Sequence, residues 1–383
     1  MKIGICQINP TVGAIDKNKQ LILDYYDKSI SNGAELVVFP ELAVTGYPPQ
    51  DLLLRDRFLT SAAAALDEIA NHTSVPMILG STLVENNNLF NCSFICENGK
   101  ILGHYKKILL PTYDVFDEDR YFKSGNKIGT FEFKISNELK RVGLQICEDL
   151  WDQNYSIGLA ESIKDANADM IINISASPFG DDRLIERSNL IQEKVQKTGL
   201  PFIYCNLVGA QDELIFDGQS LVYDHEGSLI AKGKAFNEDL MIVDFDESSK
   251  IKLNSLDREE SIYQALSLGV KDYFSKTGHS QAVIGLSGGI DSSLTACIAV
   301  EALGKENVHG ISMPSKFSSD HSISDAEILA KNIGIDYREI PIHSIVESFE
   351  ALLASDLDKD NIGVAEELSL IHISEPTRRT PSS

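Results

Sequence analysis

The sequence predicts two α/β domains, a layered one followed by a parallel, Rossmann-like one, and three observations support this. At 383 residues the chain is long enough for two domains. From residue 1 to about residue 246, short β-rich runs alternate with amphipathic helices and hairpin turns, which is typical of sheets covered by helices. After a polar segment, strands and helices alternate one by one, which is typical of a parallel sheet.

The elements of the first domain follow from the hydrophobic pattern. Apolar and β-branched runs predict strands, and apolar residues at helical spacing predict helices. Glu97-Asn98-Gly99-Lys100 and His225-Glu226-Gly227-Ser228 are typical of hairpin turns between strands. The predicted strands are 2–8, 35–39, 76–84, 91–97, 141–147, 169–175, 201–205, 219–223 and 240–244. The predicted helices are 16–31, 56–72, 156–166 and 182–198.

A polar segment without a sustained period, 247–258, predicts a linker after a first domain at 1–246. The second domain, 259–367, begins with a helix at 259–275 whose apolar positions share one face. The elements predicted after it are strand 281–286, helix 291–303, strand 307–313, helix 323–333 and strand 335–341.

The last stretch, 368–383, suits neither a helix cap nor a strand partner. It resembles translated sequencing-adapter read-through, so we expect a non-native tail and exclude it from the fold. The second domain then stops after three strands, and we expect the chain to be truncated on its C-terminal side.

Composition and charge exclude several classes of function. The chain has 34 basic against 57 acidic residues, a formal net charge of -23, which would repel the phosphates of a nucleic acid. It has no apolar stretch long enough to span a membrane, and no signal peptide precedes the strand-like run at its N-terminus. The six cysteines are scattered, which is typical of reduced thiols. We therefore expect a cytoplasmic protein whose partners include neither nucleic acid nor membrane.

Three reactive side chains lie in or next to strand-like runs: Glu41, Lys107 and Cys147. A thiol near its free pKa is mostly protonated at neutral pH, so a nucleophilic cysteine needs help. A lysine favours the thiolate and can donate to the oxyanion of a tetrahedral intermediate, and a glutamate can carry the thiol proton to departing ammonia. The trio therefore suits covalent cleavage of an amide. Taken singly, the cysteine could equally be buried core, and the glutamate and lysine solvated surface.

The flanks of the trio carry a family resemblance. They read Phe39-Pro40-Glu41-Leu42, Thr45-Gly46-Tyr47-Pro48-Pro49, Tyr105-Lys106-Lys107, Leu110-Pro111, Ile146-Cys147-Glu148-Asp149 and Trp151. Over roughly the first 245 residues the chain resembles the nitrilase superfamily, and within it the glutaminase domain of glutamine-dependent NAD synthetases. The resemblance implies an αββα sandwich with Glu41 as base, Lys107 as oxyanion partner, Cys147 as nucleophile and Glu118 orienting Lys107. Only the Lys-x-x-Leu-Pro spacing favours Lys107 over Lys106.

The same resemblance implies a glutamine site. Tyr113, Ser177 and Arg183 match residues that hold glutamine, and Glu148 could meet the α-ammonium group. The chemistry is sensible, because an arginine can bind an α-carboxylate through two hydrogen bonds. The alternative for the last part of this set is a loop that only caps the next helix, with Asp181 as the cap.

A glycine-rich loop stands between the first strand and the next helix of the second domain: Gly285, Leu286, Ser287, Gly288, Gly289, Ile290, Asp291, Ser292 and Ser293. Glycines allow a sharp turn, and N–H groups at a helix N-terminus attract phosphate. The loop lacks the Gly-Lys-Ser/Thr of a Walker A motif. It resembles the pyrophosphatase loop of ATP-splitting amidotransferases, which implies ATP as substrate and Asp291 as a residue that helps to position Mg²⁺. The alternative is a turn with only packing duties.

A cluster of serines follows the second strand of this domain. Met313-Pro314-Ser315 with Ser318, Ser319, Ser322 and Asp325-Ala326 resembles the corresponding segment of NAD synthetases. The cluster is also compatible with a plain N-cap for the next helix. A cap and a family signature can share residues, so both interpretations stay open.

Together the resemblances imply a two-step enzyme. Cys147 would release ammonia from glutamine, ATP would adenylate deamido-NAD at loop 285–293, and ammonia would displace AMP to give NAD. The family also implies a homo-oligomer and no tightly bound cofactor. With the expected truncation, the ligase step should be impaired. Two rivals stay open: an amide hydrolase with a vestigial second domain, and a nucleotide-binding module without catalysis.

Overall fold

The computed structural model describes residues 1–135, 138–316 and 318–352, and the tail expected at 368–383 lies outside these residues. The chain divides into two compact units, Met1–Asp272 and Tyr273–Ser383. None of the helices in the described ranges is both long and apolar enough to cross a membrane.

The first sheet of unit Met1–Asp272 has six strands in the order β14-β1-β2-β3-β4-β5. β1 pairs in parallel with β2 and antiparallel with β14, so the last strand of the unit lies beside the first. β3, β4 and β5 form an antiparallel meander. The bounds are β1 Lys2–Gln7, β2 Leu36–Val38, β3 Met77–Glu85, β4 Asn88–Glu97, β5 Lys100–Lys106 and β14 Asp239–Asp244.

The second sheet of this unit has six strands in the order β13-β12-β9-β8-β7-β6. β7, β8 and β9 are parallel neighbours, and antiparallel strands flank them on both sides. Parallel neighbours bring their carboxyl ends to one edge of the sheet, where loops commonly carry functional residues. The bounds are β6 Gly129–Ile135, β7 Glu138–Ile146, β8 Met170–Ser175, β9 Phe202–Asn206, β12 Leu221–Tyr223 and β13 Leu229–Lys232.

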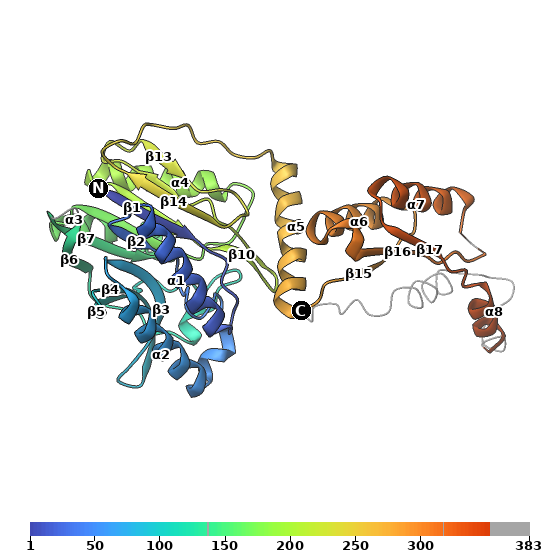
Figure 1. The fold of residues 1–383 in the computed structure, drawn as a ribbon, viewed down its shortest axis with the longest axis horizontal. Helices are drawn as coiled ribbons and strands as arrows, with labels where there is room; N and C mark the ends of the chain where they lie inside the picture. Colours follow the sequence, from blue (N-terminus) through green and yellow to red (C-terminus); the bar gives the residue numbers. More distant parts are fainter. Residues whose placement is uncertain (136–137, 317, 353–383) are drawn as a thin grey trace. The chain divides into compact units, whose positions relative to one another are not determined.

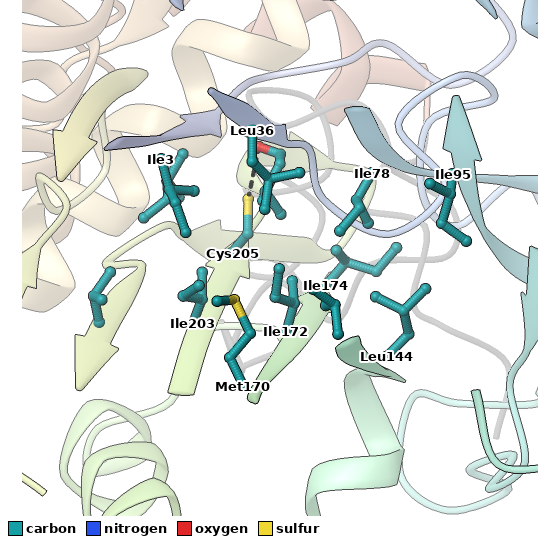
Figure 2. Packing of buried hydrophobic residues seen from close by; sticks show 14 of the residues in the cluster. Ile3, Leu36, Ile78, Ile95, Leu144, Met170, Ile172, Ile174, Ile203 and Cys205 are labelled. Atoms are coloured by element: carbon teal, nitrogen blue, oxygen red, sulfur yellow. Dashed lines mark hydrogen bonds between the residues drawn. The ribbon is translucent and has the colours of Figure 1, made fainter. Parts of the chain in front are cut away.

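The two sheets share one hydrophobic core. Figure 2 shows this core, with Ile3 and Leu36 of the first sheet packed over Ile203 and Cys205 of the second. The Cys205 thiol also lies 3.6 Å from the backbone oxygen of Val38, across the two sheets. Central strands covered on both faces read as nearly continuous apolar runs, which is why the sequence predicts them well.

Helices cover the outer face of each sheet (Figure 1). α1 and α2 pack on the first sheet through residues such as Ile22, Tyr26 and Ile69, and α3 and α4 pack on the second through Ile163 and Ile191. The bounds are α1 Ile15–Ser31, α2 Asp56–His72, α3 Leu159–Asp165 and α4 Arg183–Thr198. The layers therefore follow the order helix, sheet, sheet, helix, which confirms the αββα sandwich.

A separate hairpin and the part of a long helix up to Asp272 complete the first unit. The bounds are β10 Val208–Gln211, β11 Leu214–Asp217 and α5 Arg258–Thr277. β10 and β11 form a two-stranded sheet of their own. α5 packs Ala265 and Leu268 against Val208, and the Asp272 carboxylate accepts a hydrogen bond of 2.7 Å from the backbone N–H of Ala210. The hairpin is thus fixed against α5.

The second unit is built on a three-stranded parallel sheet, β15-β16-β17. Leu286, Ala296, Val308 and Ala326 form its core, in which α6 and α7 pack against the sheet. The bounds are β15 Ala282–Gly285, α6 Ile290–Leu303, β16 Val308–Ser312, α7 Asp320–Ile333, β17 Asp336–Glu339 and α8 His343–Leu352. The parallel βαβ arrangement predicted for this part of the chain is confirmed.

The structure differs from the predicted elements in several places. It adds β5, β6, β10, β11, β13 and α8, and it confines the helix predicted at 156–166 to α3. The helix predicted at 323–333 begins earlier, at Asp320, because Ser319 caps it by accepting a hydrogen bond from the backbone N–H of Ser322. Short 3-10 helices lie at Gln50–Leu54, Glu118–Arg120, Cys147–Leu150, Asp152–Asn154 and Lys305–Asn307.

Candidate active site

The three reactive residues follow the carboxyl ends of strands in the first unit. Glu41 comes shortly after β2, Lys107 directly after β5, and Cys147 directly after β7. All three side chains are buried, and the Cys147 thiol lies close enough to Glu41 and Lys107 to interact electrostatically with both. Strand ends from both sheets therefore bring together residues that are far apart in the sequence.

A buried charge cluster holds Lys107 between two carboxylates. The Lys107 ammonium lies 2.8 Å from Oε1 of Glu41 and 2.9 Å from Oε1 of Glu118. Burial disfavours the lysine charge, but Glu118 and Glu41 outweigh this and raise the pKa of Lys107 well above its usual value. Tyr47 donates a further hydrogen bond of 2.8 Å to Glu118. Lys107 therefore remains an ammonium in a site without solvent.

Glu41 is fixed from three directions. Its Oε1 accepts hydrogen bonds from Asn91 at 2.7 Å and from Lys107 at 2.8 Å, and its Oε2 accepts one from the backbone N–H of Ala176 at 2.9 Å. Gly80 of β3 packs against its backbone so closely that a Cβ there would stand 2.6 Å from the Glu41 Cα. The carboxylate is therefore held by contacts from β3, from β4, and from the turns after β5 and β8.

Cys147 occupies a tight turn from strand to helix. Its φ is +44°, a left-handed conformation that is costly for a residue with a side chain, and it begins a 3-10 helix. Burial and the charge of Glu41 raise the pKa of the thiol well above its usual value, and Lys107 opposes this. The resting thiol is therefore neutral, and its activation needs a neighbouring base.

Asp149 joins the turn at Cys147 to the segment that follows Lys107. One of its oxygens accepts hydrogen bonds from the backbone N–H groups of Ile108 and Leu109, at 3.2 and 2.9 Å. The other accepts them from the Ile146 N–H at 2.9 Å and the Tyr105 hydroxyl at 2.8 Å. Burial raises the pKa of Asp149 to about 6, and these donors oppose the shift. The carboxylate thus fixes the turn that carries Cys147 relative to the segment that follows Lys107.

A cavity of about 250 Å³ opens onto Cys147. All four residues predicted to hold glutamine line it: Tyr113, Glu148, Ser177 and Arg183. The hairpin β10–β11 supplies another wall, and no element was predicted in this part of the sequence. The other lining residues are Asp114, Val115, Phe116, Trp151, Pro178, Phe179, Glu213, Leu214 and Ile215.

The cavity carries groups of opposite charge. The Glu148 carboxylate accepts hydrogen bonds from the hydroxyls of Tyr113 at 2.9 Å and Tyr155 at 3.1 Å. Burial raises the pKa of Glu148, and the two hydroxyls oppose this. The Arg183 guanidinium lies 5.1 Å from the ring centre of Trp151. An occupant with one cationic and one anionic group would match both partners.

Two alternatives from the sequence are resolved by the positions of the side chains. Lys106 pairs with Glu85 and lies 4.0 Å from the ring centre of Phe90, so Lys107 is the lysine that enters the charge cluster. Asp181 does not cap α4, so that alternative is wrong: its carboxylate pairs instead with Arg258, at 2.8 Å. The residue at the N-cap position, Asp182, makes no capping hydrogen bond through its side chain.

Several residues of the site were missed by the sequence interpretation. Asn91 and Tyr47 bond the two carboxylates of the cluster, Asp149 joins two turns, and Arg187 forms a buried ion pair with Asp217 beneath the cavity. Asp149 and Tyr47 could have been found from their position, because they lie in the segments around Glu41 and Cys147 that carry the family resemblance. Asn91, Arg187 and Asp217 carried no such signal.

The glycine-rich loop of the second unit turns from β15 into α6. Gly288 has a φ of +79°, and a Cβ there would stand 2.2 Å from the backbone oxygen of Ser322. The Ser287 hydroxyl accepts a hydrogen bond from the Gly289 N–H at 3.3 Å and lies 3.1 Å from the Ser292 hydroxyl. The loop is therefore folded back by its own hydroxyls and exposed at Ser287, Gly289, Ile290 and Asp291.

Asp291 fits a metal ion only as a shared ligand. Within the described ranges no group of three or more His, Cys, Asp or Glu residues is placed to hold a metal. Asp291 is exposed in the first turn of α6, beside the loop. Mg²⁺ is usually bound through one or two carboxylates together with substrate phosphates, and a single exposed carboxylate suits that arrangement.

The chemistry of the first site is that of covalent amide cleavage. A neutral thiol, a fixed carboxylate and a permanent ammonium supply a nucleophile, a proton carrier and an oxyanion donor. The loop of the second unit offers backbone N–H groups and hydroxyls at a helix N-terminus, which suit phosphate.

Comparison with known proteins gives matches over both parts of the chain. Residues 2–252 match the carbon–nitrogen hydrolase family, and residues 262–367 match the NAD synthase family. The glutamine-dependent NAD(+) synthetase of Synechocystis sp. is 42% identical over 388 residues, covering 95% of this chain and 69% of that protein. A solved structure of glutamine-dependent NAD+ synthetase from Acinetobacter baumannii, in complex with ADP, is 33% identical with a TM-score of 0.89, covering 96% of this chain and 69% of that one. An amidase of the nitrilase superfamily from Nesterenkonia shares the fold over 64% of this chain and 91% of that one, with a TM-score of 0.56 and 20% identity.

Proposed function

We infer the function from the premise that this chain belongs to the family of glutamine-dependent NAD(+) synthetases. We propose that it hydrolyses glutamine at Cys147 and uses the ammonia for the ATP-dependent amidation of deamido-NAD to NAD. The observation that carries the proposal is the buried set of Glu41, Lys107 and Cys147 at a cavity with one cationic and one anionic wall. An α-amino acid amide matches that cavity in charge.

Glu41 acts first as a base. It takes the proton of the Cys147 thiol, and the sulfur attacks the amide carbon of glutamine to form a tetrahedral oxyanion. When this intermediate collapses, the C–N bond breaks and Glu41 gives its proton to the departing ammonia, which leaves a thioester. Glu41 then takes a proton from water, the hydroxide attacks the thioester, and the Cys147 sulfur leaves with that proton as glutamate forms.

Lys107 stabilises both oxyanions. An ammonium has three N–H donors, and two of them are used on Glu41 and Glu118. The third remains for the oxyanion. Because the two carboxylates fix the ammonium in advance, it needs little reorganisation when negative charge develops. Glu118 thus orients Lys107 without touching the substrate.

Glutamine is oriented by the charges of the cavity. Arg183 and Ser177 hold the α-carboxylate, and Glu148, supported by Tyr113, holds the α-ammonium group. The side-chain amide then lies at Cys147. Two charged contacts at one end of the substrate fix the distance to the reacting carbon, which is the main advantage of a bound over a free reactant.

The loop at 285–293 serves the second step. Its N–H groups and hydroxyls hold the pyrophosphate portion of ATP while the carboxylate of deamido-NAD attacks the α-phosphate, so that pyrophosphate leaves and an adenylate forms. Ammonia then displaces AMP to give the amide. Asp291 would hold Mg²⁺, which supplies neutralisation of phosphate charge when bound. The NAD synthase match at residues 262–367 supports a domain at 259–367 for this step, after a glutaminase domain at 1–246 and a linker at 247–258.

The proposal is tested by following glutamine and NAD in parallel. The parent chain should release ammonia from glutamine, and Cys147→Ala should lose at least about 1,000-fold of that activity. Cys297→Ala, a cysteine of the second unit, should keep it. In a complete version of the protein, with the C-terminal part of the family restored, NAD formation from deamido-NAD and ATP should persist in Cys147→Ala when free ammonium is supplied. In that version, glutamine hydrolysis without NAD formation would favour the amide hydrolase, and nucleotide binding without hydrolysis would favour the binding module.

A further inference from the structure

Arg187 of α4 is the largest side chain that is fully buried in the first unit, and the mechanism above does not use it. Its Nη1 lies 2.8 Å from Oδ1 and 3.0 Å from Oδ2 of Asp217. Its Nη2 donates to the backbone oxygens of Ser177 and Pro178, both at 2.9 Å. A buried arginine is costly unless its charge and its N–H groups are paired. These contacts therefore offset the cost of burial, and they indicate which parts of the chain Arg187 holds.

Arg187 joins two walls of the glutamine cavity. Ser177 and Pro178 belong to the turn after β8, and Asp217 ends β11, whose Leu214 and Ile215 also line the cavity. The planar guanidinium reaches both walls at once, which the compact ammonium of a lysine cannot do. Arg187 therefore ties these two segments together, in addition to the backbone hydrogen bond of 2.7 Å from the Phe179 N–H to the Ile215 oxygen.

Arg187 also decides the hydrogen-bonding role of Ser177. A serine hydroxyl has two acceptor positions and one donor hydrogen. Both acceptor positions face N–H groups of Arg187, with Nε at 3.3 Å and Nη2 at 3.1 Å, the second through a hydrogen that Nη2 shares with a backbone oxygen. The hydroxyl of Tyr204, which lies beneath Arg187, is near enough to Ser177 to interact with it but makes no hydrogen bond of good geometry among the described residues, so it is a weak competitor for the serine hydrogen. The hydrogen of Ser177 is left for the occupant of the cavity.

We propose that Arg187 is a positioning residue that turns Ser177 into an obligate hydrogen-bond donor and so makes this wall of the cavity selective for a carboxylate. The inference rests on the proposed function, in which glutamine occupies the cavity. With its acceptor positions filled, Ser177 cannot receive an ammonium group, but it can donate to a carboxylate beside Arg183. The ammonium group is left with Glu148. Arg187 thus fixes the direction in which glutamine enters without touching it.

Binding of two glutamine analogues separates this role from a structural one. Glutaramate lacks only the α-amino group, and γ-aminobutyramide lacks only the α-carboxylate. Trp151 is the single tryptophan of the chain and lines the cavity, so its fluorescence reports binding to a Cys147→Ala background, in which no ligand is turned over. Adding Arg187→Lys should lower the affinity for glutamine and for glutaramate about 10-fold or more, because a hydrogen bond to a charged group is lost. The same substitution should change the affinity for γ-aminobutyramide by no more than about 2-fold.

A double-mutant cycle tests whether Arg187 acts through Ser177. Ser177→Ala should show the same selective loss, and adding Arg187→Lys to it should weaken glutaramate by less than about 3-fold more. Ser188→Ala is the matched control, because Ser188 follows Arg187 on α4 and its hydroxyl lies 2.6 Å from that of Tyr223. Ser188→Ala should change the affinity for neither analogue. Should Arg187→Lys fail to fold, Arg187→Gln combined with Asp217→Asn leaves no buried charge unpaired and should give the same selectivity.

The outcomes are distinguishable. If Arg187→Lys lowers the affinity for both analogues equally, or for neither, the proposed role of Arg187 is overturned while the glutamine site stands. Full additivity in the cycle would do the same. If the parent background binds neither glutamine nor glutaramate, the proposed function fails, and this inference fails with it.

Discussion

The approach of Gly80 to Glu41 predicts that Gly80→Ala damages catalysis far more than it damages the fold. A Cβ at this position would stand 2.2 Å from the backbone nitrogen of Leu42 and 2.6 Å from the Cα of Glu41. Ordinary van der Waals contact begins at 3.4 Å, so the two segments must separate by about 1 Å. Glu41 is fixed by hydrogen bonds of 2.7 to 2.9 Å, which such a shift would stretch or break.

A displacement of about 1 Å at a catalytic group costs roughly 100-fold in rate. In a steady-state assay of ammonia release from glutamine, we therefore expect kcat to fall about 100-fold. KM should stay within about 3-fold, because Glu148 and Arg183, which we propose to hold the substrate, lie on other elements. The change is thus expected in the chemical step and not in binding.

The matched control is Gly103→Ala on β5 of the same sheet, where a Cβ would stand 2.7 Å from a ring carbon of Phe131. Both substitutions overpack a strand and should lower the free energy of unfolding in urea titrations, Gly80→Ala by about 1–3 kcal/mol and Gly103→Ala by less, because the Phe131 side chain can move and the backbone at Leu42 cannot move as easily. Only Gly80→Ala should lose kcat. A folded Gly80→Ala protein whose kcat lies within about 3-fold of the parent would refute the reasoning that β3 sets the position of the base.

Two further predictions concern Glu118 and the loop of the second unit. Burial raises the pKa of Glu118 to about 7 against the opposing charge of Lys107, so its carboxyl takes up a proton as the pH falls through that value. The kcat/KM for glutamine should therefore fall on the acid side of about pH 7, and Glu118→Gln should lower it about 10-fold and abolish that inflection; an unchanged pH profile would contradict this. Gly288→Ala places a Cβ 2.2 Å from the Ser322 oxygen at a φ of +79°, so it should weaken ATP binding in calorimetry about 10-fold or more while glutamine hydrolysis is kept; an unchanged affinity would show that the loop does not hold the nucleotide.

The elements that could be predicted from the sequence are those with a strong local pattern. The central strands of both sheets are covered on both faces, so their apolar runs stood out, and the catalytic turns lay at the ends of those runs. The strands β5 and β13 were missed although the hairpin turns before them were recognised, because most of β5 is exposed or half-buried and β13 has only four residues. β10 and β11 were missed because no glycine or proline marks the turn between Gln211 and Leu214.

The partners of the catalytic residues were beyond a sequence interpretation for a different reason. Asn91 lies 50 positions from Glu41 along the chain, and Asp217 lies 30 from Arg187. Nothing in the local pattern distinguishes an asparagine that fixes a base from one that is solvated on a strand. Such contacts depend on how strands, turns and helices that are distant in the sequence pack together, which the sequence alone does not reveal.

Helix α4 shows how far burial can reverse the meaning of a pattern. Arg183, Arg187 and Lys194 fall on one stripe of a helix with 3.6 residues per turn, and a cationic stripe on an amphipathic helix is usually its solvated face. Here Arg183 lines the cavity, Arg187 joins its walls, and Lys194 is buried in an ion pair with Asp152. Asp152 also accepts a hydrogen bond from the Leu159 N–H at 2.8 Å, so the pair fixes the segment that carries Tyr155, a donor to Glu148. The stripe of α4 that a sequence pattern assigns to solvent is therefore the one that organises the substrate cavity.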